Sequence, residues 1–219
     1  KQATAFSSSQ QDTNQYGMKV TLNSQLMDGW QITWGLDAEH ERFTSNQMFF
    51  DLAQASASGG LNNHKIYTTG RYPSYDITNL AAFLQSSYDI NDIFTVSGGV
   101  RYQYTENRVD DFIDYTQQQK IAAGKAISAD AIPGGSVDYD NFLFNAGLLM
   151  HITERQQAWF NFSQGVALPD PGKYYGRGIY GAAVNGHLPL TKSVNVSDSK
   201  LEGVKVDSYE LGWRFIGDN

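Results

Sequence analysis

The sequence predicts an all-β protein. More specifically, it predicts an antiparallel up-and-down transmembrane β-barrel, of which this chain supplies about seven strands with long extracellular loops. Three observations support this prediction: apolar and polar residues alternate over segments of roughly ten to fourteen residues, short and long connections alternate between these segments, and the apolar positions are rich in large aromatics. A strand that crosses a membrane needs only about 9–11 residues of such alternation.

The composition narrows the classes of function. The chain has 219 residues, with 16 basic and 23 acidic residues and a net charge of -7. This acidic balance argues against a nucleic-acid partner, because binding phosphates requires clustered Lys and Arg. The absence of cysteine excludes disulfides, thiolate zinc sites and a cysteine nucleophile. The many glycines and aromatics favour strands and turns over helices.

The first two expected strands meet at the dipeptide Asp28-Gly29, which favours a tight hairpin turn. Lys19, Thr21 and Asn23 separate the apolar residues before the turn, and polar residues separate most of those after it. The alternating apolar positions of this hairpin are Tyr16, Met18, Val20, Leu22, Trp30, Ile32, Trp34, Leu36 and Ala38. The period of two predicts one apolar face and one polar face.

Five further strands follow with the same period. Two of them flank the turn 89–92, two flank the turn 152–156, and the last covers residues 208–215. Three connections are short and three are long, the long ones covering residues 44–76, 106–139 and 166–206. Strands that run up and down place every second connection at the same rim, which is the layout of an outer-membrane barrel. We expect a short helix at residues 116–128 within the second long loop.

The two faces of the expected sheet differ in chemistry. The apolar face carries large aromatics near strand ends, where amphipathic rings match a membrane–water boundary. The other face carries Asp37, Glu39 and Glu41 on one strand and Arg101 on another. A soluble half-buried sheet also alternates, but charges along a whole face fit a wet lumen better. We therefore favour a membrane barrel over a soluble β-protein.

Three segments resemble the barrel repeats of TonB-dependent outer-membrane receptors. They are "FLQSSYDINDIFTVSGGVRY" at 83–102, "AWFNFSQGVALPDPGKYYG" at 158–176 and "VDSYELGWRF" at 206–215. In that family, a strand with an aromatic-polar-Ser-x-Gly ending leads into a proline-containing extracellular loop. The three matches occur in the family's order.

The resemblance implies a receptor and transporter for a ferric siderophore, in the bacterial outer membrane as a multi-pass β-barrel and energised by TonB. Residues 1–219 would form part of the barrel domain, with a plug domain and the remaining strands of a barrel of about 22 strands outside this chain. The implied siderophore is of the citrate-based dihydroxamate type. The other implied partners are TonB, acting through the plug, outer-membrane lipid and, as a lesser candidate, a bacteriocin. We expect no cofactor, because the siderophore itself carries the iron.

Two loop clusters are candidate ligand-binding sites, because an anionic siderophore requires cationic donors and flat aromatic surfaces. The candidates in the first long loop are Lys65, Tyr67, Arg71 and Tyr72. Those in the third are Lys173, Tyr174, Tyr175, Arg177 and Tyr180. The alternative for each residue is that it only packs loop against loop. We expect Arg177 to contact the ligand together with at least one tyrosine of its cluster.

Two other functions remain open at the level of sequence. An outer-membrane barrel enzyme could use Asp37, Glu39 and Glu41 as an acid–base set or metal site, although we favour a solvated wall facing basic residues of a plug. His40 and Glu41 do not complete the H-E-x-x-H pattern of a zinc protease. The third possibility is a passive porin. The sequence favours the receptor, with no catalytic residue and no metal ligand.

Overall fold

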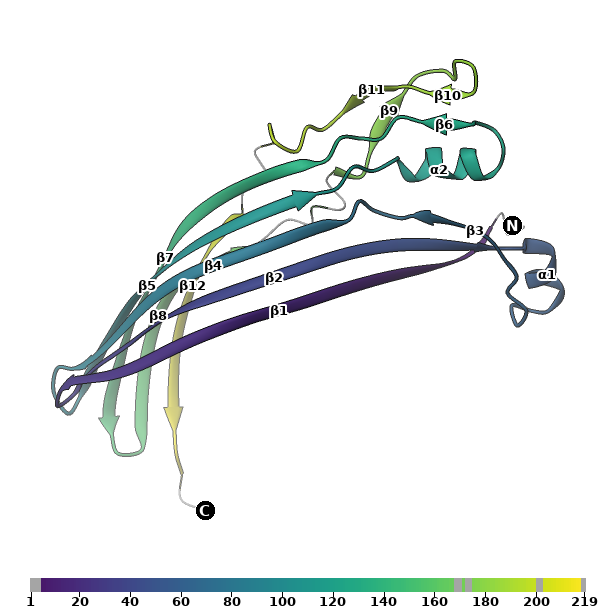
Figure 1. Ribbon diagram of the computed structural model, residues 1–219. Helices are drawn as coiled ribbons and strands as arrows, with labels where there is room; N and C mark the ends of the chain where they lie inside the picture. Colours follow the sequence, from purple (N-terminus) through teal and green to yellow (C-terminus); the bar gives the residue numbers. More distant parts are fainter. Residues whose placement is uncertain (1–4, 168–170, 172–174, 200–202, 218–219) are drawn as a thin grey trace.

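The computed structural model describes residues 5–167, 171, 175–199 and 203–217. Its main feature is a curved antiparallel sheet of seven long strands (Figure 1). These strands are β1 (Phe6–Met27), β2 (Trp30–Phe50), β4 (Tyr75–Asp89), β5 (Phe94–Val109), β7 (Gly135–Thr153), β8 (Gln156–Ala167) and β12 (Val204–Phe215). They pair in the order in which they occur along the chain, so the predicted up-and-down arrangement is confirmed.

Five of the seven strands are longer than the sequence predicts, whereas β8 and β12, with 12 residues each, have the expected length. β1 has 22 residues and β2 has 21, against an expected length of roughly ten to fourteen. Their pairing continues without interruption from Gln25 opposite Gln31 to Phe6 opposite Phe50. The apolar alternation on β2 stops at Ala38, and polar residues such as His40 and Arg42 then occupy the same face. The sequence pattern therefore marked only the apolar part of these two strands.

The three predicted short turns are confirmed. Gly29 adopts a positive φ of 73° in the turn between β1 and β2, a conformation that glycine accepts without steric cost. Its carbonyl accepts a hydrogen bond of 2.8 Å from the backbone N–H of Asp89, which ties the first short turn to the second. The third turn joins β7 to β8 at Glu154 and Arg155.

The register of the sheet separates the residues into two faces. One row across five strands contains Leu22, Trp34, Leu84, Val100 and Phe144. The opposite face carries the row Asp37, Ala81, Gln103 and Asn141. Trp34 and Glu39 therefore lie on opposite faces, as predicted.

The polar face is the concave one. Ala81 and Asn141 are only 7% and 9% exposed, whereas Leu36 on the apolar face is 59% exposed. Side chains converge on the inside of a curved sheet and diverge on its outside, which explains this difference. We call the concave side of the seven strands the wall.

The long connections contain two short helices, α1 (Leu52–Ala57) and α2 (Tyr115–Ala122). α2 confirms the helix expected at 116–128, but it ends earlier, just before Gly124, whose φ is 69°. α1 was not foreseen; its N-cap, Asp51, accepts a hydrogen bond of 2.9 Å from the backbone N–H of Gln54. In the described part of the chain, neither helix has the length and hydropathy needed to cross a membrane.

The three long loops pack together at one end of the sheet, and we call this assembly the loop layer (Figure 1). Besides the helices it contains β3 (Lys65–Gly70), β6 (Ser128–Ala129), β9 (Gly178–Tyr180), β10 (His187–Leu188) and β11 (Leu190–Ser193). β6 of the second loop pairs with β10 of the third, while β9 pairs with β11. Two small clusters of buried residues hold the layer together, one around Tyr75 and Val109 and one around Ala129 and Leu188.

Candidate ligand-binding cavity

A cavity of about 410 Å³ lies where the three long loops meet. Its lining comes from all three of them. The lining residues are Arg71, Tyr72, Asp114, Tyr115, Thr116, Gly176 and Arg177. The structure thus brings the first predicted cluster, through Arg71 and Tyr72, into the same site as the second, through Arg177.

Two backbone hydrogen bonds at the end of β3 fix the position of Arg71. The N–H of Arg71 donates to the carbonyl of Ser45 at 3.0 Å, and the N–H of the preceding Gly70 donates to Gln118 Oε1 at 2.8 Å. Glycine is required here for space, since a Cβ on Gly70 would lie 2.9 Å from the ring of Phe112. The first loop is therefore fixed against α2 directly beside the cavity.

The guanidinium of Arg71 lies over two aromatic rings. It is 4.6 Å from the ring centroid of Tyr115 and 5.4 Å from that of Tyr72. A guanidinium over a ring face is attracted to the π-electrons, while its N–H donors remain in its own plane. The rings hold the cation without using its donors.

The start of α2 contributes the remaining polar groups. Asp114 is the N-cap of the helix, and its carboxylate accepts a hydrogen bond of 2.8 Å from the backbone N–H of Thr116. It is only 9% exposed. Capping occupies one of its oxygens and places the helix N-terminus, with its favourable potential for anions, at the cavity.

The two cavity arginines differ from Arg42 and Arg101, which are paired with carboxylates. Within the described residues, neither Arg71 nor Arg177 forms an ion pair with a carboxylate. In contrast, Arg42 contacts both Asp76 and Asp110. The cavity therefore combines two guanidinium groups that lack a carboxylate partner with a single carboxylate that caps a helix.

The other candidates of the third loop have different positions. Tyr175 is only 2% exposed and belongs to the buried cluster around Tyr75, with its hydroxyl against Ser199 Oγ. The hydroxyl of Tyr180 donates to the carbonyl of Asp130 at 2.7 Å, and burial raises the pKa of this phenol. Both side chains therefore pack the third loop against neighbouring parts of the chain and do not line the cavity. Lys173 and Tyr174 lie outside the described residues.

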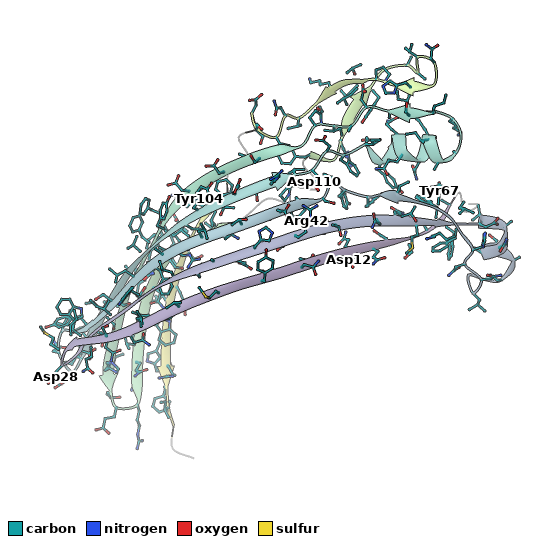
Figure 2. All side chains as sticks on the ribbon, in the orientation of Figure 1. Asp12, Asp28, Arg42, Tyr67, Tyr104 and Asp110 are labelled. Carbon is teal, nitrogen blue, oxygen red and sulfur yellow. The ribbon has the colours of Figure 1, made fainter. Side chains whose placement is uncertain are left out.

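The other candidates of the first loop do not line the cavity. Lys65 is exposed at the beginning of β3. Tyr67 stacks on Phe49 with ring centroids 4.7 Å apart. Burial raises the pKa of the Tyr67 hydroxyl, and the neighbouring Tyr115 raises it further by a smaller amount. Figure 2 shows Tyr67 at the loop end of the sheet.

Sequence reasoning missed Asp114, Tyr115 and Thr116. Their only signal was an aspartate before a helix-compatible segment, which indicates a helix start but not what the helix packs against. The contact arises from the pairing of the flanking strands, β5 and β7, with their neighbours. No local pattern encodes it.

Two members of the acidic ladder of the wall, Asp37 and Glu39, have side-chain partners within the chain. Arg101 donates through both terminal nitrogens to Asp37, at 2.7 and 2.9 Å. Glu39 accepts from the side-chain amide of Gln15. The described residues contain no group of three His, Cys, Asp or Glu side chains placed to hold a metal ion. The arrangement is a hydrogen-bonded wall, and the basic partner of Asp37 comes from this chain.

A curved antiparallel sheet with an apolar convex face, a polar concave face and a loop layer at one rim is the architecture of part of a transmembrane β-barrel. The family model described as "TonB dependent receptor-like, beta-barrel" matches residues 2–219. The chain belongs to this family, whose members reside in the bacterial outer membrane.

Curated relatives give a more specific likeness. The chain is 90% identical over all 219 residues to the ferric aerobactin receptor of Klebsiella pneumoniae and 84% identical to that of Escherichia coli. It is 48% identical over 209 residues, 95% of the chain, to the rhizobactin receptor of Rhizobium meliloti (strain 1021). The chain spans 30% of the length of each of the first two and 28% of the third.

Solved structures support the fold alone. The ferric yersiniabactin uptake receptor FyuA from Yersinia pestis matches 99% of this chain and 28% of its own, with a TM-score of 0.59 and 15% identity. The copper transporter OprC matches 97% of this chain and 28% of its own, with a TM-score of 0.62 and 13% identity. Barrel geometry is therefore shared between proteins whose titles name different cargoes.

Proposed function

We propose that the protein to which this chain belongs is an outer-membrane receptor that binds ferric aerobactin in the loop layer and transports it inward. The observation that carries the proposal is the cavity with two arginines, Arg71 and Arg177, neither of which is paired with a carboxylate in the described part of the chain. The relatives named ferric aerobactin receptor, at 90% and 84% identity, support the choice of ligand.

The chemistry of the cavity suits this ligand. Aerobactin is the citrate-based dihydroxamate that the sequence analysis expected, and its ferric complex presents carboxylates. A guanidinium offers two parallel N–H donors to a carboxylate and stays protonated when water is removed. The ring of Tyr72 supplies flat surface for the apolar arms. Arg71, Tyr72 and Arg177 are the predicted site residues that this proposal retains.

The rest of the proposal concerns the source of energy for transport and the choice between a transporter, an enzyme and a porin. Transport would draw on TonB through a plug domain that binds inside the completed barrel, with the wall as the outer boundary of the path. The relatives are named receptors, which supports transport over catalysis. The pairing of Asp37 with Arg101 and of Glu39 with Gln15 favours neither the barrel enzyme nor the metal site considered above, and nothing in the described residues favours a porin.

The test is equilibrium binding of ferric aerobactin to the full-length receptor in detergent. Removing one charged partner at a desolvated site costs about 2–5 kcal/mol, so Arg177→Ala and Arg71→Ala should each weaken binding by roughly thirtyfold or more. Arg108→Ala is the matched control. Arg108 is exposed near the same rim, but its register places it on the convex face with Arg42 and Asp76.

The control should bind within about twofold of the parent, since it removes the same charge outside the cavity. Equal weakening in all three variants would reduce the effect to long-range charge and argue against a specific site. Unchanged binding in Arg71→Ala and Arg177→Ala would show that the cavity serves packing and would contradict the proposal.

A further inference from the structure

We infer that Tyr115, the first residue of α2, is a positioning residue that holds Arg71 in the orientation needed to bind a carboxylate of the ligand. The inference rests on the proposed function and extends it to a loop that the sequence analysis left without a binding role. Tyr115 would act through Arg71, so its contribution depends on that side chain.

The geometry links the two residues directly. The Arg71 guanidinium is nearer to the ring of Tyr115, at 4.6 Å, than to that of its own neighbour Tyr72, at 5.4 Å. With no carboxylate partner among the described residues, Arg71 has only these two rings to restrain a long, flexible side chain. A cation held over a ring loses less conformational freedom when it binds a ligand.

Tyr115 is itself well anchored. It begins a helix whose N-cap, Asp114, is buried. Its ring lies 6.3 Å from that of Phe49, which in turn stacks on Tyr67. A row of aromatic rings thus runs from β3 through the end of β2 to α2 and ends at Arg71. These contacts restrain the ring of Tyr115 on which the Arg71 guanidinium lies.

A second set of contacts attaches the backbone beside Arg71 to the helix that carries Tyr115. Gln118, one helical turn after Tyr115, accepts the hydrogen bond from the N–H of Gly70, and its side-chain amide donates to the carbonyl of Ile113 at 2.6 Å. The backbone of the first loop is therefore tied to the same helix that carries the ring. Tyr115 and the backbone beside Arg71 are therefore attached to the same helix, whereas Arg177 belongs to the third loop.

A double-mutant cycle tests the inference in the full-length receptor, with ferric aerobactin as the probe. Tyr115→Leu removes the ring and keeps an apolar side chain, whereas Tyr115→Phe keeps the ring. Each is combined with Arg71→Ala and, separately, with Arg177→Ala. Heat-induced unfolding in detergent confirms that each variant is folded.

Tyr115→Leu should weaken binding about threefold to tenfold in the parent and by the same factor in the Arg177→Ala background. In the Arg71→Ala background it should have no further effect, since the side chain that it positions is gone. Tyr115→Phe should bind like the parent. This dependence on background distinguishes positioning of Arg71 from general support of the loops.

Three outcomes would overturn the inference. Equal weakening by Tyr115→Leu in both arginine backgrounds would mean that the ring contacts the ligand itself or supports the whole layer. Parent-like binding by Tyr115→Leu, while Arg71→Ala weakens binding, would refute the positioning role and leave the proposed function intact. Parent-like binding by Arg71→Ala would remove the proposed site and this role together.

Discussion

The wall and the loop layer use arginine in opposite ways. In the wall, Arg101 reaches across β4 from β5 to Asp37 on β2, and both terminal nitrogens bind that carboxylate. In the loop layer, Arg71 lies over two rings and Arg177 lines the same cavity, and neither forms an ion pair with a carboxylate of the described residues. Residue type alone therefore does not indicate whether an arginine is structural or available to a ligand.

The difference shows where the arginines of each region find the groups that they contact. Along the wall, the regular register brings Arg101 within reach of Asp37 across one intervening strand, so this carboxylate obtains its basic partner within the chain. In the loop layer, aromatic rings restrain the cation instead and leave its hydrogen-bond donors uncommitted. A ligand carboxylate can then supply the interaction that Asp37 supplies in the wall.

The largest expected effect concerns the two faces of the wall. Trp34→Arg places a charge in the middle of the convex apolar band and should destabilise the full-length receptor by about 2–4 kcal/mol, since lipid cannot solvate it. Gln31→Arg places the same charge on the concave, hydrated side of the same strand and should cost less than about 1 kcal/mol. Unfolding in lipid bilayers measures both. Equal destabilisation would contradict the assignment of the faces.

The next prediction contrasts the two kinds of arginine directly. Arg101→Ala leaves Asp37 without its partner and should destabilise the receptor by about 1.5–3 kcal/mol, while ferric aerobactin affinity stays within about twofold. Arg177→Ala should show the reverse, with weakened binding and a change in stability within about 0.5 kcal/mol. Both variants require unfolding and binding measurements on the same preparation. Parallel losses in both would remove the distinction between wall and loop layer.

The smallest effect concerns the junction between the second and third loops. The backbone N–H of Leu190, at 2.8 Å from Oδ2, and then the side chain of His187, at 3.0 Å from Oδ1, lower the pKa of Asp130. A carboxyl whose pKa is lowered by folding stabilises the junction when the pH is above its ordinary pKa of 3.8. This contribution is lost as the pH falls through the pKa of the folded state.

Hydrogen exchange at the amide of Leu190, corrected for the intrinsic effect of pH, measures this change. Protection in the parent should be retained at pH 5 and fall only as the pH drops below 3.8, whereas Asp130→Asn should show lower protection at pH 5 and little further change. If both proteins respond to pH in the same way, Asp130 is not the group responsible.

The amino-acid sequence by itself determined the fold class, the strand order and the facing of individual residues. Alternation with a period of two assigned Trp34 to one face and Glu39 to the other, because successive side chains in a strand point to opposite sides. Asp28-Gly29 marked its turn because only a residue such as glycine accepts the positive φ found there. These features depend on neighbours within a few residues, and short-range patterns record them.

Only the tertiary structure decided the composition of the cavity. Arg71 and Arg177 were predicted as candidates in separate clusters, and nothing in either segment showed that they would line one site. Tyr175, in the same cluster as Arg177, became buried, and Tyr115 joined the site without being foreseen. The reason is physical. The pairing of β5 and β7 with their neighbours sets where three distant loops meet, and contacts across such sequence separations leave no local pattern.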